Sequence, residues 1–395
     1  MKAETGLQVS DKARIGVIAL IRCRGADRIT AFSRNQLFGY GPWGFCAWME
    51  RESVLTTMSE SIFVSEISYR KGQAAFEELS VSSGFDFVPV EEAEEPLARR
   101  IREEGVRGFI ADIHAYEGAL YEALPPGGVI ARFGVGHDSV NKEKASASGI
   151  WVTNTPGVLD NAVAEYAVWQ LGSLARRVPF LYASTLAGKW EPRPGVEVAG
   201  RTLAIVGFGR IGQMLCRKAA LGLGMRVIGC DVDPAEKFAA RLGRPLAELQ
   251  QETGFAEYTH DRGRALAEAD FVSLHVASVP ATRHLANAAF FAAMKPGACL
   301  INTARGAILD ENALYDALTS GHLGAAALDV FEREPYSPED PGKDLRSLTN
   351  CLMTPHVGSN TAESNYAMAL TAGRTVIRIL TDGPDAVENI VNRPA

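Results

Sequence analysis

Three segments near the C-terminus each end an apolar, strand-like run with side chains that could perform acid–base chemistry. "CLMTPHVGSN" places His356 directly after a proline, "INTARG" places Arg305 before a glycine, and "LDVFEREPY" carries Glu332 and Glu334. A histidine exchanges protons near neutral pH, a nearby carboxylate stabilises its cationic form, and an arginine can grip a carboxylate through two parallel hydrogen bonds. The set therefore suits proton transfer to a substrate that bears a carboxylate, although each residue taken alone also fits a solvent-exposed loop.

A glycine-rich loop lies upstream of these segments. In "TLAIVGFGRIGQML", Gly207, Gly209 and Gly212 form the G-x-G-x-x-G pattern between an apolar strand and a helical stretch, and the next strand ends in Asp231. In this context the first glycine allows a tight turn, the second lets the backbone approach a pyrophosphate, and the third permits close packing of helix on strand. The loop predicts a dinucleotide site, whereas glycines alone would only turn a strand into a helix.

The residue that ends the second strand indicates which dinucleotide binds. Asp231 would accept hydrogen bonds from the adenosine ribose hydroxyls and repel a 2′-phosphate. Val232 and Asp233 follow it, and no arginine stands beside it in the sequence. We therefore predict NAD rather than NADP as the cofactor.

These motifs belong to two series of strands that alternate with helical stretches. The first series contains "SIFVSE", "FDFVPV", "GFIADI" and "GVIARFG" between residues 61 and 134, and the second runs from "TLAIVG" at 202 to "CLMT" at 354. Such alternation indicates βαβ units and parallel sheets, in which ligands lie beyond the carboxyl ends of the strands. We also expect a helix in "LDENALYDALTSGHLG", capped by Asp310 and ended by Gly321. The polar strand ends of the second series are Asp231, His275, Thr303 to Arg305, Asp329 and His356.

Length and composition set the broad class. The 395 residues favour two domains, and 47% hydrophobic with 22% charged residues is an ordinary globular balance. The net charge of -7 argues against a nucleic-acid partner, and no apolar run approaches the roughly eighteen residues of a membrane span. None of the six cysteines has CxxC spacing, so we expect reduced thiols and no metal site. We place the protein in the cytoplasm.

The first 57 residues differ in character from the rest. "RNQLFGYGPWGFCAWMERES" shows neither helical nor strand periodicity and is rich in glycine and aromatic residues. We interpret residues 1–57 as an N-terminal extension that is either disordered or not native, with Met58 as an alternative start.

The motifs in this order resemble the D-isomer-specific 2-hydroxyacid dehydrogenase family. The matching text is "GFGRIG", "DFVSLHVASVPATRHLAN", "MKPGACLINTARGAILDENAL", "GAAALDVFEREP" and "TPHVGSNTAES", and "ARFGVGHDSVNKEKASASGIWVTNTPGVLDNAVAEYAVW" resembles its substrate-domain signature and interdomain helix. The resemblance implies an α/β fold of two doubly wound parallel-sheet domains, Rossmann-like and flavodoxin-like, with a cleft between them. Residues 58–155 plus 361–395 would form the substrate-binding domain and residues 156–360 the NAD-binding domain.

The resemblance also implies a catalytic set. Arg305 would bind the substrate carboxylate and polarise the 2-oxo group, and His356 would be the acid/base. The family pattern "LDVFExEP" selects Glu334 rather than Glu332 as the partner of His356.

Further binding residues follow from the same resemblance. Asp329 would hold the nicotinamide carboxamide, and the backbone N–H groups of Val135 and Gly136 would take part in carboxylate binding. The implied cofactor-binding residues are Gly207, Gly209, Arg210, Ile211, Gly212, Asp231, Thr303, Ala304, Arg305, Asp329, His356, Val357, Gly358 and Ser359.

The activity implied is reversible hydride transfer between NAD and a small (R)-2-hydroxyacid. The chain would cross between the domains near Thr155-Pro156 and Thr354-Pro355, so that the cleft can close over the site. The long helix near 158–177 would support a homodimer.

The chain departs from the family pattern around the predicted pocket. Ala277 and Ser278 replace the usual Pro-Leu pair beside the cofactor, and "ADIHAYEG" at 111–118 stands where many relatives have a small, hydroxyl-rich loop. His114 and Tyr116 could therefore reshape the substrate pocket, and Arg132 adds a positive charge that could bind a second acidic group.

Two other functions remain open from the sequence. The family contains transcriptional corepressors that keep the same Arg, Glu and His, so a dinucleotide-sensing interaction protein is the leading alternative. A formate-dehydrogenase-like activity fits less well, because that branch lacks the glutamate found here at Glu334.

Overall fold

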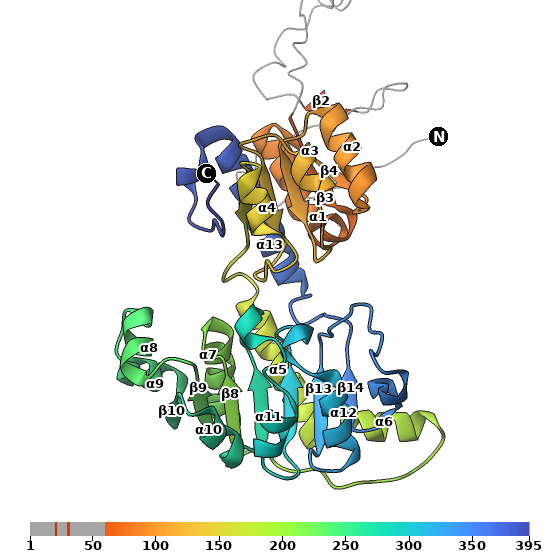
Figure 1. The fold of residues 1–395 in the computed structure, drawn as a ribbon, viewed down its shortest axis with the longest axis vertical. Helices are drawn as coiled ribbons and strands as arrows, with labels where there is room; N and C mark the ends of the chain where they lie inside the picture. Colours follow the sequence, from red (N-terminus) through yellow and green to blue (C-terminus); the bar gives the residue numbers. More distant parts are fainter. Residues whose placement is uncertain (1–19, 22–29, 32–59, 395) are drawn as a thin grey trace, which may run out of the picture. The chain divides into compact units, whose positions relative to one another are not determined.

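The computed structural model describes residues 20–21, 30–31 and 60–394 (Figure 1). Contacts divide the chain after Met58 into two units. In the first unit, β1 (Leu20–Ile21) pairs antiparallel with β2 (Thr30–Ala31). The rest of the predicted extension, 1–57, lies outside the described residues, and our interpretation of it stays a prediction.

The second unit begins with a five-stranded parallel sheet. Its strands lie in the order β4-β3-β5-β6-β7, which is the flavodoxin-like order 2-1-3-4-5 when they are counted along the chain. The side chains alternate between its two faces, because successive residues of a strand point in opposite directions. The bounds are β3 (Glu60–Ser65), β4 (Phe85–Val90), β5 (Gly108–Ala111), β6 (Val129–Arg132) and β7 (Trp151–Thr153).

Helices cover both faces of this sheet. Ile62 and Val64 pack with α1 (Glu66–Ser83) and α13 (Ala362–Asp382), whereas Phe63 faces the opposite core. On that opposite face lie α2 (Glu94–Glu104), α3 (Ala119–Ala123) and α4 (Lys142–Ala147). The C-terminal helix α13 therefore completes a core that β3 and α1 begin. Burial of each large apolar side chain of α13 contributes about 1.5–3 kcal/mol.

A seven-stranded parallel sheet follows. Its order, β10-β9-β8-β11-β12-β13-β14, is the 3-2-1-4-5-6 order of the Rossmann fold with one further strand. The direction of winding reverses between β8 and β11, so a crevice is expected there beyond the carboxyl ends of the strands. The bounds are β8 (Thr202–Val206), β9 (Arg226–Cys230), β10 (Glu257–Thr259), β11 (Phe271–Leu274), β12 (Cys299–Asn302), β13 (Ala325–Leu328) and β14 (Cys351–Met353).

This sheet also lies between two helical layers. Leu203 and Ile205 face one core and Ala204 and Val206 face the other. The first core is closed by α5 (Asp160–Ala175), α7 (Arg210–Arg217), α8 (Ala235–Leu242) and α9 (Leu246–Thr253), and the second by α10 (Arg262–Glu268), α11 (Ala288–Ala293) and α12 (Glu311–Thr319). The helix α6 (Val178–Leu186) follows α5.

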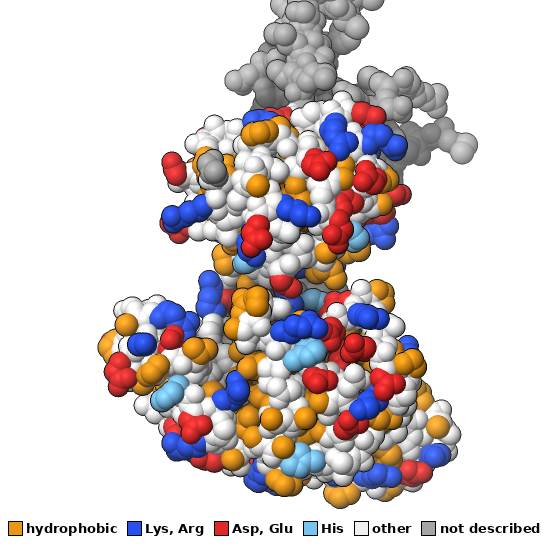
Figure 2. Space-filling model, viewed as in Figure 1, with side chains coloured by type: hydrophobic (Ala, Val, Ile, Leu, Met, Phe, Trp, Pro, Cys, Tyr) orange, Lys and Arg blue, Asp and Glu red, His pale blue; other side chains and the backbone are white. Residues whose placement is uncertain are grey.

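The predicted α/β fold with two doubly wound parallel sheets is confirmed. The expected helix is α12, whose N-cap Asp310 accepts a hydrogen bond from the N–H of Ala313 at 3.0 Å, and Gly321 adopts the left-handed φ of 74° after it. The short strands β7 and β10 were not predicted, whereas β14, which is equally short, was. No helix in the described part of the chain is long and apolar enough to span a membrane. Charged side chains of both signs are interspersed over the visible face of the described residues (Figure 2).

Candidate active site

His356 follows β14 in a strained turn. Its φ is 53°, a value that a non-glycine residue adopts only when neighbouring contacts hold it there. Its backbone N–H donates to the Asp329 carbonyl at 2.8 Å, and its Nδ1 lies 2.7 Å from Oε2 of Glu334. Because Glu334 engages Nδ1, the other ring nitrogen, Nε2, is left for a ligand.

The position of Glu334 is fixed at both carboxylate oxygens. Oε1 accepts a hydrogen bond from the N–H of Phe331 at 3.0 Å while Oε2 faces His356. Burial opposes ionisation, but the hydrogen bond and charge of His356 hold the pKa of Glu334 below its ordinary value. Glu332 points elsewhere and pairs with Arg283 and with His284 at 3.1 Å. Of the two loop glutamates, the geometry thus brings only Glu334 to His356.

Asp329, at the end of β13, holds the loop that carries His356. Its Oδ1 accepts from the Thr354 hydroxyl at 2.7 Å and the Val357 N–H at 2.9 Å, and its Oδ2 accepts from the Gly358 N–H at 2.7 Å. The side chain is 1% exposed. These bonds give Asp329 a positioning role that the sequence did not reveal, and its predicted contact with the nicotinamide stays a prediction.

Arg305 follows β12 and reaches toward the first sheet. Its Nε donates to Oδ1 of Asp138 at 3.0 Å, and a Cβ added to Gly136 would lie 1.4 Å from its guanidinium. Only a glycine therefore lets the guanidinium lie against the backbone at this point. Burial alone would raise the pKa of Asp138, but the charge of Arg305 holds it below its ordinary value. Sequence reasoning missed Asp138, although it lies in the quoted "FGVGHD".

The backbone opposite Arg305 offers free donors. The Val135 carbonyl accepts from Asn154 at 2.7 Å. Among the described residues, however, no acceptor takes the N–H of Val135 or of Gly136. Both residues line a cavity of about 480 Å³ together with Arg305 and His356. An anion could bind there between these amides and the guanidinium.

The glycine-rich loop has the predicted geometry. Gly207 has a φ of 94°, and a Cβ on it would lie 2.6 Å from the His275 carbonyl. A Cβ on Gly212 would lie 2.4 Å from the Gly207 carbonyl, so helix and strand could not pack as they do. Nothing lies within 4 Å of a Cβ built on Gly209, which borders a cavity of about 1140 Å³. The helix that starts here, α7, directs its amide-bearing end toward this open space.

Asp231 follows β9 beside the same cavity, but it has a cationic neighbour. Its Oδ2 accepts from the Phe208 N–H at 3.0 Å, and its Oδ1 pairs with Arg241 of α8 at 3.0 Å. Arg241 also contacts Asp233 at 3.1 Å. No arginine stands next to Asp231 in the sequence, but the structure places one beside it. Helix α8 brings Arg241 back to the carboxyl end of β9. Two carboxylates nevertheless hold that guanidinium.

Groups on the nicotinamide side also fit a dinucleotide. The Thr303 hydroxyl is buried and makes no hydrogen bond within the described residues, although it lines the 480 Å³ cavity with Ala304, Ile211 and Ser359. Ala277 and Ser278 line the same cavity. Such an orphaned polar atom in a cavity is expected where a ligand supplies the partner. The residues present therefore fit the cofactor that the glycine-rich loop predicts.

Three predicted cofactor residues, Arg210, Gly212 and Val357, line neither cavity, and Gly212 instead lies where α7 packs against the Gly207 carbonyl. Arg210 points to the start of α5, where its Nε lies 2.8 Å from a carboxylate oxygen of Asp160. Val357 directs its N–H to Asp329. Their predicted cofactor contacts remain untested.

Of the three residues predicted near the substrate, two line cavities that contain His356 and one does not. Arg132 is 5% exposed, borders the cavity around His356, and has its pKa lowered to about 10 by burial. His114 lines an adjoining cavity of about 470 Å³ that Arg305 and His356 share. Tyr116 is 4% exposed and packs edge-on against both Phe109 and His114, so any influence on the pocket would act through His114.

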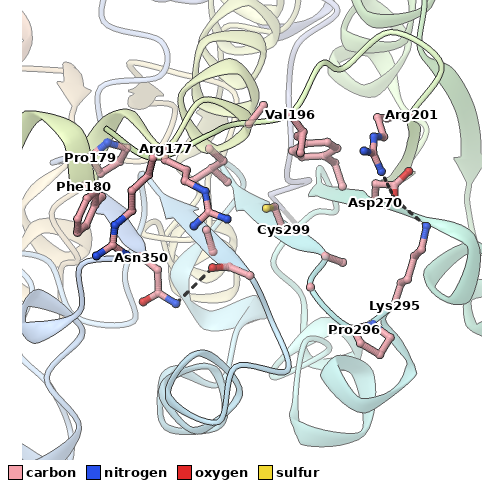
Figure 3. A pocket seen from close by; sticks show the side chains of 18 of the residues that line it. Arg177, Pro179, Phe180, Val196, Arg201, Asp270, Lys295, Pro296, Cys299 and Asn350 are labelled. Atoms are coloured by element: carbon pink, nitrogen blue, oxygen red, sulfur yellow. Dashed lines mark hydrogen bonds and ion pairs between the residues drawn. The ribbon is translucent and has the colours of Figure 1, made fainter. Parts of the chain in front are cut away.

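A separate cavity of about 590 Å³ lies at the opposite edge of the seven-stranded sheet (Figure 3). It is lined by Phe271, Cys299 and Ala325, which stand at or near the amino ends of β11, β12 and β13. Lys295 and Arg201 there both contact Asp270, at 2.7 and 3.5 Å. The catalytic candidates all lie at the carboxyl ends of the strands, so this cavity is not part of their site.

Comparison with known proteins agrees with this geometry. Residues 168–358 match the model of the D-isomer specific 2-hydroxyacid dehydrogenase, NAD binding domain. The chain is 40% identical over 283 residues to a glyoxylate reductase of Thermococcus litoralis, covering 69% of this chain and 80% of that protein. It is 42% identical over 244 residues to a hydroxypyruvate reductase of Thermotoga maritima, covering 61% and 74%.

Solved structures give the same result over more of the chain. A glyoxylate reductase from Paecilomyes thermophila superposes with a TM-score of 0.69 at 27% identity, covering 85% of this chain and 98% of that one. The predicted family, NAD as cofactor and oxidoreductase activity are thereby confirmed. The protein belongs to the D-isomer-specific 2-hydroxyacid dehydrogenase family and is an NAD-dependent oxidoreductase that interconverts 2-hydroxyacids and 2-oxoacids.

Proposed function

We propose that the enzyme interconverts an (R)-2-hydroxyacid and its 2-oxoacid with Arg305 as carboxylate clamp and His356 with Glu334 as acid–base pair. The observation that supports this best is that Arg305, Glu334 and His356 all line one cavity of about 470 Å³. There the guanidinium of Arg305 lies against Gly136, and His356, held at Nδ1 by Glu334, keeps Nε2 free.

In reduction, the substrate carboxylate binds between Arg305 and the amides of Val135 and Gly136, displacing Asp138 from the guanidinium. NAD, in its reduced form, supplies the hydride that C2 accepts. His356 donates its Nε2 proton to the developing alkoxide, and Glu334 stabilises the ring while it is cationic. General acid catalysis of this kind contributes roughly 10²–10⁴ in rate, and a well-placed donor to the oxyanion about 3 kcal/mol.

The chain's residues toward the cofactor have separate tasks. Gly207 and Gly209 let the pyrophosphate approach the start of α7, and Asp231 binds the adenosine ribose. The Thr303 hydroxyl and Asp329, which line the cavity beside His356, would hold the nicotinamide end. His275, whose pKa burial lowers to about 4, stays neutral beside them.

The assignment is tested by NADH oxidation with 2-oxoacids and by Arg305→Ala. The variant should lose both substrate binding and turnover, with kcat/KM lowered at least 100-fold. An unchanged far-UV circular dichroism spectrum and melting temperature control for folding, because Arg305 is itself among the predicted cofactor-binding residues. Near-native kcat/KM in Arg305→Ala would refute the clamp.

We also propose the predicted division into residues 58–155 plus 361–395 and residues 156–360. Apolar contacts of α13 with α1, through Met368, Ala369 and Ala372, support the return of the chain to the first domain. Cytoplasmic location stays a prediction.

A homodimer is proposed as well. Apolar side chains of α5, α6 and the segment after them face solvent: Trp169 is 72% exposed, Leu186 71% and Trp190 90%. Monomeric proteins rarely leave such a group uncovered. Leu186→Glu should shift the mass in light scattering from dimer to monomer, whereas Val81→Glu, on exposed α1 surface, should not.

The corepressor-like alternative is not favoured by the relatives, which are named as reductases and dehydrogenases. Tight NADH binding without turnover of any 2-oxoacid would reverse that preference.

A further inference from the structure

Residues 387–392, which follow α13, lie along the edge strand β7. This strand is the last of the five-stranded sheet, and Ile390 forms an antiparallel bridge with Thr153 at its end. The N–H of Val391 donates to the Val152 carbonyl at 2.8 Å. These contacts bring the segment to the carboxyl end of β7, where the chain leaves the sheet.

Asn389 binds the residue that follows β7 with both its side chain and its backbone. Its Nδ2 donates to the Asn154 carbonyl at 2.5 Å, and its own carbonyl accepts from the Asn154 N–H at 3.3 Å. The same Nδ2 donates at 3.2 Å to the hydroxyl of Thr375, which is a buried residue of α13. Asn154, which is 9% exposed, is therefore fixed to α13 by way of Asn389.

Asn154 and its neighbour hold the backbone where we propose that the substrate carboxylate binds. The Nδ2 group of Asn154 donates to the Val135 carbonyl at 2.7 Å. The Thr155 N–H donates to the Gly134 carbonyl at 2.9 Å. In a planar trans peptide, the C=O group and the N–H group that follows it point in opposite directions. The bond from Asn154 therefore orients the N–H of Gly136, and the bond from Thr155 orients the N–H of Val135.

The orientation of these two peptides bears on ligand binding, because Val135 and Gly136 line the cavity that Arg305 and His356 share. A hydrogen bond weakens steeply as its donor turns away from the acceptor, and a bond to a charged acceptor is about twice as strong as a neutral one. Rotation of either peptide plane would thus weaken the hold on a carboxylate. It would not disturb the proton at His356, which Glu334 holds from another element.

Asn392 offers a matched comparison within the same segment. Its Nδ2 donates to the Ile150 carbonyl at 2.8 Å and to the hydroxyl of Ser146 at 3.0 Å. Its Oδ1 accepts from the Val152 N–H at 2.7 Å. These three bonds hold the segment to β7 and α4, and none of them reaches the backbone at 134–136.

We infer that Asn389 is a positioning residue for the substrate carboxylate, because through Asn154 it fixes the peptides whose N–H groups bind that carboxylate. The inference rests on the proposed function, which assigns carboxylate binding to the amides of Val135 and Gly136 together with Arg305. Loss of the contact should weaken binding of the ground state and of the transition state equally, and so raise KM while kcat changes little.

Asn389→Ala, compared with Asn392→Ala, separates positioning of the carboxylate site from anchoring of the segment. Steady-state NADH oxidation is measured with whichever of glyoxylate, hydroxypyruvate, pyruvate and phenylpyruvate the native enzyme reduces best. Asn389→Ala should raise KM for this 2-oxoacid about tenfold and keep kcat within about twofold. Asn392→Ala should keep KM within about twofold even where it lowers the melting temperature as much. A native KM in Asn389→Ala, a loss confined to kcat, or an equal rise in KM in both variants would overturn the inference.

Asn154→Ala removes the donor to the Val135 carbonyl directly, and it decides the question if Asn389→Ala does not fold. It should raise KM about tenfold as well, and the double variant should lose less than the product of the two single losses, because both residues act on the same peptides. A native KM in Asn154→Ala would also overturn the inference. The proposed function fails separately, if the native enzyme reduces none of the four 2-oxoacids or if Arg305→Ala keeps near-native kcat/KM.

Discussion

Glu334→Gln is the sharpest test of the acid–base pair, because the substitution keeps shape and removes charge. In the native site one oxygen of Glu334 accepts from the Phe331 N–H at 3.0 Å and the other faces Nδ1 of His356 at 2.7 Å. A glutamine has one carbonyl oxygen, so it can accept from only one of these donors. Its NH₂ group must then meet the other donor.

The expected loss follows from that geometry. A hydrogen bond to a charged group contributes about 1.5–3 kcal/mol, and the His–Glu contact is only about a quarter exposed, with 24% and 23% of the side chains accessible. A loss of about 2–3 kcal/mol in the transition state corresponds to a roughly 30- to 150-fold fall in kcat/KM. The fall should lie mainly in kcat, since Glu334 stabilises the ring and does not bind the substrate.

The assay is stopped-flow and steady-state NADH oxidation with the best 2-oxoacid, together with NADH affinity by fluorescence. Glu334→Asp, which keeps the charge at a longer distance, should recover part of kcat. If Glu334→Gln retained kcat within threefold of the native enzyme, the assignment of Glu334 as the partner of His356 would be wrong.

Three further predictions follow from other contacts. Arg305→Lys should lower kcat/KM about 100-fold and raise KM, because an ammonium cannot hold a carboxylate through two parallel hydrogen bonds. If the same assay showed a change in KM alone, Arg305 would not polarise the oxo group. Asp231→Ser should raise the preference for NADPH over NADH at least tenfold, because it frees Arg241 to bind a 2′-phosphate. The additional substitution Arg241→Met should abolish that gain. The ratio of the kcat/KM values for the two cofactors measures the preference. Burial opposes ionisation of Glu94, but the N–H groups of Gly118, Glu117 and Leu120 hold its pKa below the ordinary 4.5. Its stabilising contribution is therefore present above that value and disappears as the pH falls through the folded-state pKa. Glu94→Gln should cost about 1 kcal/mol in urea unfolding at pH 7 and progressively less as the pH falls below 4.5; a cost that does not change with pH would contradict the ionic origin.

Local pattern was sufficient for the elements that carry strong periodicity. The glycine-rich loop, the strand before it and the Asp310 cap of α12 depend on neighbours in the chain, and each has the predicted form. The strands β7 and β10 were missed, and in the structure they are defined by their parallel pairing with β6 and β9.

The candidate site was predicted residue by residue but not contact by contact. His356 and Arg305 stand just beyond the expected strand ends and Glu334 in the loop after β13, whereas Asp138 reaches Arg305 from 167 residues away. Arg241 likewise pairs with Asp231 because α8 folds back toward the end of β9, a contact that no neighbouring sequence motif predicts.

The sequence by itself determined that a dinucleotide loop, a histidine, an arginine and a glutamate would stand at the carboxyl ends of parallel strands, since strand periodicity and glycine geometry are local properties. Only the tertiary structure decided what surrounds them: the Asp329 bonds that fix the His356 loop, the glycine against which Arg305 lies, and the cavity that Arg305 and His356 share. These contacts join segments that are distant in the chain, and packing rather than local propensity brings such segments together.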